Sequence, residues 1–380
     1  MKKLNTLNLI KGIGIIMIIM VHNRHFLMQD MSGLRPLINF GQMGCQLFFF
    51  VSGFSLCFSW EHMTYSAPSK PVVSTYFQFL LRRYLRLAPG FLIIMISNLV
   101  LNILLMDILN FPPGFIMNKE PFAILTNILF IHGLFPDYIN NVFPGGWYLG
   151  TAFLLYAAFP LLYGIMKKLF YRLPILMNAV PIVLLLFNHC LLRWITVMTK
   201  NALYPSNNSF LYFFFTNHLP CFSLGILLYF QEKKNFSAKC PILISVPLFL
   251  VSGFLCIGMF LMPDTHYLFT IIPSVAGLSV YWLGVALIHF EKKPGKRFSS
   301  FFARFLAECG QSSYGMYLVH AFVCWYGMKA LNYFLTINGG AYNDILVYML
   351  LLVPSVFVVF VLGLYMERLL FWIDKKLRPA

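Results

Sequence analysis

The sequence predicts an all-α polytopic membrane protein with about ten transmembrane helices and one short re-entrant or interfacial segment. Of its 380 residues 59% are hydrophobic and only 11% are charged, whereas a soluble domain is nearer half apolar and a quarter charged. Many apolar runs reach the roughly 18 residues that span a bilayer. The runs are continuously apolar rather than alternating, which indicates helices and not the strands of a membrane barrel.

Eleven apolar segments follow one another along the chain. Segment 121–134 has only 14 residues, a length that favours a re-entrant or interfacial piece over a span. No small-residue cleavage site follows the first segment, so we expect a retained first span rather than a signal peptide. The segments are 10–27, 39–59, 84–108, 121–134, 147–166, 174–192, 210–230, 241–262, 266–290, 304–331 and 344–367.

The basic residues decide between ten and eleven spans, because cytoplasmic segments of membrane proteins carry an excess of Lys and Arg. If segment 121–134 does not cross, both termini are cytoplasmic and 22 of the 28 Lys and Arg lie inside, with six outside. If it does cross, every later cluster changes side and 18 lie outside, with 10 inside. The ten-span topology is therefore predicted.

The net charge of +16 does not indicate a protein that binds nucleic acid, because the basic residues form short clusters between apolar runs. Such clusters suit anionic membrane lipid or an anionic cofactor at the cytoplasmic face. No second domain or long polar linker is evident, so residues 1–380 are predicted to form a single membrane domain without a soluble extracytoplasmic domain. The eight scattered cysteines include no CxxC pair and are expected to pack within helices.

The first span carries Lys11 at its start and His22 near its end. Eleven steps of 100° bring the two residues to within roughly 20° of the same helix face, about 16 Å apart along the axis. Lys11 can be a topology anchor whose amine reaches the interface, and His22 can be an interfacial histidine bonded to a neighbour. Ionisable groups inside a membrane are nevertheless functional candidates by default, and His serves as base or nucleophile near neutral pH.

The third span begins with RRYLRLAPG, in which Arg83 and Arg86 are three residues apart and share a helix face. Paired guanidiniums bind phosphate bidentately. The alternative is a basic topology anchor, although three arginines within five residues exceed what an anchor requires. The glycines of GQMGCQLFFFVSGF, residues 41–54, are interpreted as sites of close helix packing.

Later segments add three polar candidates and one aromatic one. In GQSSYGMYLVH, Ser313, Tyr317 and His320 lie on one helix face, which needs partners in the bundle or a water-filled cavity. Trp147 begins the GGWYLG segment, where an interfacial belt residue is the alternative. His218 lies only three residues from a cysteine with no carboxylate nearby, so no metal site is predicted.

Six of these stretches, in this order, resemble the membrane acyltransferase type 3 family over nearly the whole chain. The resembling stretches are LNLIKGIGIIMIIMVH, LFFFVSGFSLCFS, RRYLRLAP, WYLGTAFLLYAAFPLL, HLPCFSLGILLY and SSYGMYLVH. Two positions depart from the family pattern. Lys11 stands where the family usually has Arg, which keeps the charge but loses the bidentate fork. Ala152 stands where many members carry Glu, so no role for that carboxylate is carried over.

The resemblance implies a membrane O-acyltransferase that moves an acyl group, most simply acetyl, from acetyl-CoA to a glycan or lipid-linked saccharide. Arg83 and Arg86 would bind the CoA phosphates, with Lys11 in support. His22 would be general base or transient acyl carrier. Trp147 with Ser313, Tyr317 and His320 would bind the acceptor. The implied location is the bacterial cytoplasmic membrane. The alternative interpretations are a transporter or flippase of a lipid-linked saccharide and a non-catalytic membrane scaffold.

Overall fold

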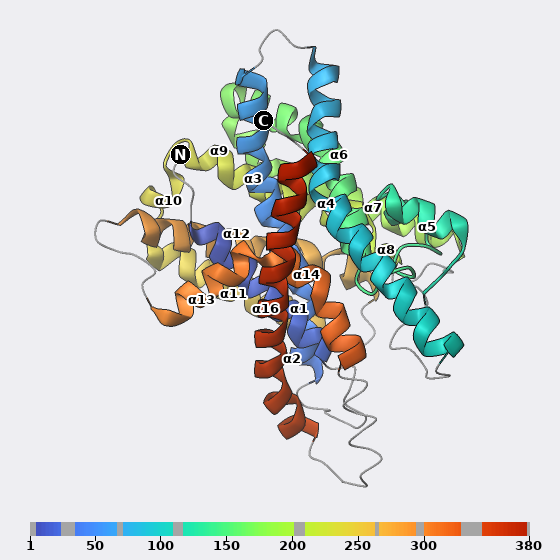
Figure 1. Ribbon diagram of the computed structural model, residues 1–380. Coiled ribbons are helices and arrows are strands. Elements are labelled where there is room, and N and C mark those ends of the chain that lie inside the picture. Colours follow the sequence, from blue (N-terminus) through green and yellow to red (C-terminus); the bar gives the residue numbers. More distant parts are fainter. Residues whose placement is uncertain are drawn as a thin grey trace.

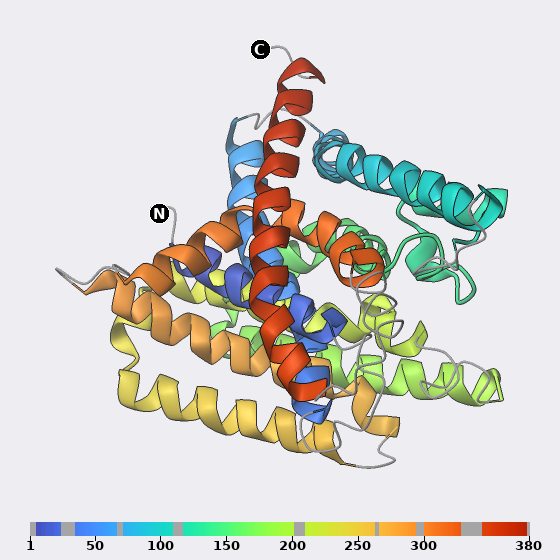
Figure 2. The ribbon, with the colours of Figure 1, turned by 60° about the horizontal axis from the view of Figure 1, so that its bottom comes forward.

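The computed structural model describes residues 5–23, 35–66, 71–108, 117–200, 210–262, 266–293, 300–327 and 344–377. Within these ranges the chain is built of helices and their connections, with no strand. Figure 1 shows the helices packed into a bundle, and α16 runs along its front in both Figure 1 and Figure 2. The all-α prediction is confirmed.

The elements follow one another with short 3-10 or π segments (η) between several of the α-helices. In chain order they are α1 (Asn5–Asn23), α2 (Arg35–Asn39), η2 (Phe40–Met43), α3 (Gly44–Ser66), α4 (Val72–Asn102), η3 (Ile103–Ile108), α5 (Pro121–Ile128), η4 (His132–Leu134), α6 (Trp147–Arg172), α7 (Pro174–Met198), α8 (Phe210–Phe213), η5 (Phe215–His218), α9 (Leu219–Glu232), α10 (Phe236–Lys239), α11 (Ile242–Leu261), η6 (His266–Thr270), α12 (Ile272–Lys292), α13 (Phe301–Gln311), α14 (Ser313–Ala321), η7 (Phe322–Gly327) and α16 (Asp344–Leu377).

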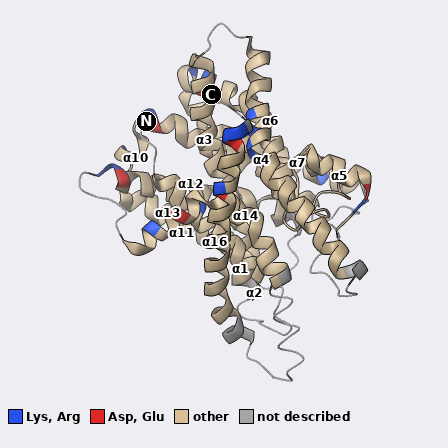
Figure 3. Ribbon diagram, in the orientation of Figure 1, with Lys and Arg blue, Asp and Glu red and all other residues tan. Residues whose placement is uncertain are grey.

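Eight helices within the described ranges are long and apolar enough to cross a membrane, and each coincides with a predicted span. Their bounds are Asn5–Asn23, Leu37–Ser66, Val72–Leu105, Trp147–Arg172, Pro174–Met198, Ile242–Leu261, Ile272–Lys292 and Tyr348–Lys376. Figure 3 agrees with a membrane setting, because the stretch of α16 below its label is free of coloured charged residues.

The other two predicted spans, 210–230 and 304–331, are broken into shorter pieces. The first contains α8, η5 and α9, and Pro220 lies in the first turn of α9. The second contains α13, α14 and η7, with Ser312 at the break between α13 and α14. Interrupted helices at membrane depth occur where the freed backbone groups are buried in protein or line a cavity.

Segment 121–134 forms only the eight-residue helix α5, followed by the three residues of η4. At 1.5 Å per residue α5 is about 12 Å long, which is less than half of the bilayer's hydrocarbon thickness. The structure therefore agrees with the prediction that this segment does not span.

Glycines allow the central helices to approach each other closely. A Cβ at Gly44 would lie 2.4 Å from the Gly14 carbonyl oxygen, and one at Gly53 would lie 2.1 Å from the Phe222 carbonyl oxygen. Any larger residue would force α3 away from α1 or α9. The packing role predicted for the 41–54 glycines is confirmed. The packing role predicted for the cysteines holds for the seven that are buried, whereas Cys190 is exposed.

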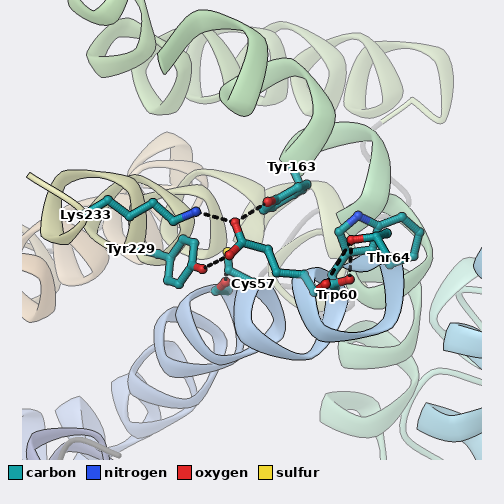
Figure 4. Close-up of polar contacts among 8 residues, drawn as sticks. Cys57, Trp60, Thr64, Tyr163, Tyr229 and Lys233 are labelled. Carbon is teal, nitrogen blue, oxygen red and sulfur yellow. Dashed lines mark hydrogen bonds and ion pairs between the residues drawn. The ribbon is translucent and has the colours of Figure 1, made fainter. Parts of the chain in front are cut away.

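A carboxylate joins three helices at one end of the bundle. Glu61 of α3 accepts hydrogen bonds from the hydroxyls of Tyr163 on α6 and Tyr229 on α9, both at 2.6 Å. The Lys233 amine, just after α9, also contacts this carboxylate. Figure 4 shows the three partner side chains converging on it. The junction fixes one end of α3, the helix whose opposite face lines the candidate site.

Candidate active site

A cavity of about 260 Å³ lies between α1, α3, α4, α6, the end of α13, α14 and α16. Five of the eight side chains predicted to form the site line it: Lys11, Arg83, Arg86, Ser313 and Tyr317. They come from three separate motifs of the sequence, which the tertiary structure brings together around one cavity. The remaining lining residues are Phe48, Val51, Ser52, Ser55, Leu56, Leu87, Tyr148, Leu149, Tyr156, Gln311, Tyr314 and Glu367.

One wall of the cavity is basic. Arg83 donates from Nη2 to the Ser59 hydroxyl and lies over the Phe79 ring, 5.3 Å from its centroid. Arg86, one turn further along α4, has Nη2 3.6 Å from Oε2 of Glu367, and its side chain is 58% exposed. Lys11 on α1 also lines the cavity, so that three cations face it. Such a cavity attracts an anion such as a phosphate group.

Tyr317 of α14 lines the cavity and contacts two other rings. Its ring lies between those of Tyr148 and His320, with centroid separations of 4.9 Å and 5.0 Å. Its hydroxyl donates to the Gly145 carbonyl oxygen. Gly145 has a φ of +82°, a left-handed conformation that glycine adopts without strain. The turn before α6 thus meets the middle of α14.

Two histidines lie beyond Tyr317. The rings of His22 and His320 are 5.0 Å apart, centroid to centroid, and that of His22 is 6.3 Å from Trp325. His320 is fully buried, with Nδ1 in contact with the Tyr317 carbonyl oxygen. Its Nε2 has no hydrogen-bond partner among the residues that the structure describes. The sequence predicted a role for each histidine but did not predict that they form a pair.

A family model described as an acyltransferase domain matches residues 4–364, which is essentially the whole chain. The chain belongs to this acyltransferase family. No curated protein and no solved structure shows significant similarity to it. With eight apolar helices within its described residues, this acyltransferase is a multi-pass membrane protein.

In this acyltransferase Trp147 does not line the cavity. The indole stacks on Phe213, with centroids 4.4 Å apart and ring planes 18° apart, and lies 5.7 Å from His218. It is buried, whereas the belt alternative would place it at a membrane surface. Its neighbour Tyr148 lines the cavity. Trp147 therefore supports the wall, and its contact with substrate stays a prediction.

His132 supports the turn that receives Tyr317. Its Nε2 lies 3.1 Å from the carbonyl oxygen of Gly146, and a Cβ at Gly150 would lie 2.5 Å from the same nitrogen. Burial lowers the pKa of His132 from 6.5 to about 4, because desolvation disfavours the imidazolium. A neutral ring that donates to Gly146 therefore holds the turn in place.

Sequence reasoning missed two parts of the site. Glu367 lies at the end of the last apolar run, where a charge reads as an ordinary interfacial residue. Gly145 contributes only its backbone carbonyl, which any residue type carries. The sequence held one signal of the turn at Gly145, namely the two consecutive glycines directly before Trp147.

Proposed function

We propose that this acyltransferase moves an acyl group, most simply acetyl, from acyl-CoA on the cytoplasmic side to a hydroxyl of a surface or lipid-linked glycan such as O-antigen, capsule or exopolysaccharide. It would work in the bacterial cytoplasmic membrane with both termini in the cytoplasm. The observation that carries the proposal is the cavity, which is lined by three cations and by Tyr317, whose ring contacts His320 of the His22–His320 pair.

The basic wall suits the phosphates of the donor. Arg83 and Arg86 present planar guanidiniums that bind phosphate bidentately, and Lys11 adds a point charge. The same cavity is lined by Tyr148, Ser313 and Tyr317. The donor's extended arm would lie along these residues, so that its thioester approaches Tyr317 and the histidines.

The proposed chemistry balances in either of two forms. With His22 as general base, the acceptor hydroxyl loses its proton to the imidazole while its oxygen bonds to the acyl carbon. The carbon–sulfur bond of the thioester breaks, and the CoA thiolate takes up a proton. With His22 as acyl carrier, the ring nitrogen first displaces the thiolate and the hydroxyl then displaces the imidazole. Trp147, Ser313, Tyr317 and His320 would bind the acceptor.

Membership of an acyltransferase family favours the enzyme over a transporter or flippase of a lipid-linked saccharide. Both proteins would need a polar cavity inside the bundle. Only the enzyme needs His22 as a reacting group. The two functions therefore differ in the result of one substitution.

The test is the transfer of labelled acetyl from acetyl-CoA to host glycan in membrane vesicles. We expect transfer by the unsubstituted protein and a loss of about a hundredfold or more in His22→Ala, the usual size of a general-base effect. His189→Ala is the matched control, because His189 bonds to Thr270 away from the cavity. Full transfer by correctly folded His22→Ala protein would overturn the catalytic role of His22.

A further inference from the structure

Glu367 is the one acidic residue among the described residues that line the cavity, whose other charged residues are Lys11, Arg83 and Arg86. A cavity built only to attract an anion would gain nothing from a carboxylate, because like charges repel at this range. The position of Glu367 on the basic wall therefore needs a reason.

The two carboxylate oxygens of Glu367 have different partners on different helices. Oε2 lies 3.6 Å from Nη2 of Arg86 on α4. Oε1 accepts a hydrogen bond of 3.1 Å from the backbone N–H of Gly315, in the first turn of α14. A carboxylate at a helix N-terminus is stabilised by the unpaired amides and the helix dipole. Glu367 therefore links the basic wall to the helix that carries Tyr317.

The two contacts differ in how firmly they hold. At Gly315 the helices touch, since a Cβ there would lie 2.3 Å from the Gly363 carbonyl oxygen. The carboxylate is consequently fixed on the α14 side, and its side chain is only 19% exposed. The Arg86 side chain is 58% exposed, and 3.6 Å is long for an ion pair. Arg86 is thus the partner that can turn away.

We propose that Glu367 is an internal counter-ion, which holds Arg86 in the empty cavity and competes with the phosphate of the acyl donor for that guanidinium. The inference rests on the proposed function. When the donor binds, Arg86 turns from the carboxylate to the phosphate, while Glu367 stays on the Gly315 amide. Glu367 is a positioning residue and makes no contact with the reacting atoms.

The competition weakens donor binding, so removing the charge strengthens it. Glu367→Gln keeps an oxygen that accepts from Gly315 and loses the charge. We expect the dissociation constant of a non-transferable CoA thioether to fall about two- to fivefold, since partly exposed ion pairs contribute about that much. Glu367→Ala loses the charge and the acceptor. Its donor affinity should rise equally, but kcat should fall about fivefold because the first turn of α14 loosens.

The experiment measures calorimetric binding of the CoA thioether and steady-state transfer for the purified full-length protein. The control is Glu308→Gln, which removes an exposed carboxylate of α13 that does not line the cavity and should leave affinity unchanged. Unchanged or weaker binding by Glu367→Gln would overturn the inference, as would equal tightening by Glu308→Gln. If the unsubstituted protein binds no CoA thioether, the proposed function itself fails, which is a separate result.

Discussion

At the scale of single residues, the proposed function depends strongly on Tyr317, because this residue lines the cavity and its ring contacts His320. Its hydroxyl bond to the Gly145 carbonyl fixes the ring beside His320. We predict that Tyr317→Phe lowers kcat of acetyl transfer about fivefold, the equivalent of one hydrogen bond of about 1 kcal/mol. The measurement is steady-state transfer at saturating donor. Tyr348→Phe, whose hydroxyl bonds to Met20 outside the cavity, should keep the full rate, and equal losses in both variants would refute the assignment.

The arginines allow a prediction with a different kinetic signature. Arg83 and Arg86 would contact the donor in the ground state and in the transition state alike, so their loss removes uniform binding. The double variant Arg83→Ala with Arg86→Ala should raise the KM for acetyl-CoA at least tenfold and change kcat by less than threefold. Arg172→Ala, at the exposed end of α6, controls for general loss of surface charge. An unchanged KM in the double variant would remove the phosphate role.

At the scale of elements, the sequence predicts which residues share a helix face better than it predicts which residues of different helices contact each other. Arg83 and Arg86 share a face because they are one turn apart, and Ser313 and Tyr317 do so for the same reason. These relations depend on helical periodicity alone. The meeting of Glu367 with Gly315 depends on how closely α14 and α16 pack. Neither residue carries a local signal of that contact.

The turn before α6 gives a prediction on pH. His132 is neutral in the folded protein down to about pH 4, whereas an unfolded chain takes up the proton near 6.5. Its contribution to stability is therefore present above pH 6.5 and is lost as the pH falls to 4. This amounts to about 3 kcal/mol at 1.36 kcal/mol per pH unit. Urea unfolding in detergent at pH 7 and pH 4.5 measures it.

His132→Asn is the variant for that comparison, since its amide can donate to Gly146 and does not titrate. Other groups of the protein titrate equally in both proteins. Each protein loses some free energy of unfolding between pH 7 and pH 4.5. The difference between the loss in the unsubstituted protein and the loss in His132→Asn is therefore the contribution of His132. Parallel losses of stability in the two proteins would show that the buried imidazole contributes nothing to the pH dependence.

The Glu61 junction of three helices gives a prediction on stability (Figure 4). In Glu61→Ala the hydroxyls of Tyr163 and Tyr229 and the Lys233 amine lose their common acceptor. Losing two hydrogen bonds to a charged acceptor should lower the free energy of unfolding by about 3 kcal/mol. Denaturant unfolding in detergent is the measurement. The control is Glu120→Ala, an exposed carboxylate that accepts from one tyrosine; a loss of equal size there would contradict the account.

At the scale of the whole molecule, the charge distribution and the helix lengths predict the same topology by independent arguments. The basic clusters favour ten spans because only then does the excess of Lys and Arg lie inside. The eight-residue length of α5 leaves no eleventh crossing between α4 and α6. What the sequence leaves open is how the broken segments 210–230 and 304–331 pass through the bundle, since apolar runs do not reveal where a buried helix is interrupted.

Two exposed positions, Asp137 before α6 and Lys168 near the end of α6, separate the ten-span and eleven-span topologies. With ten spans, Asp137 is outside and Lys168 inside, and with eleven spans the two are reversed. In a Cys190→Ser background, which removes the exposed native thiol, Asp137→Cys should react with a membrane-impermeant maleimide on intact spheroplasts. Lys168→Cys should react only after lysis, because its side chain would face the cytoplasm. The reverse pattern would place the basic clusters that follow segment 121–134 outside while Arg83 and Arg86 stayed inside, and would refute the ten-span topology.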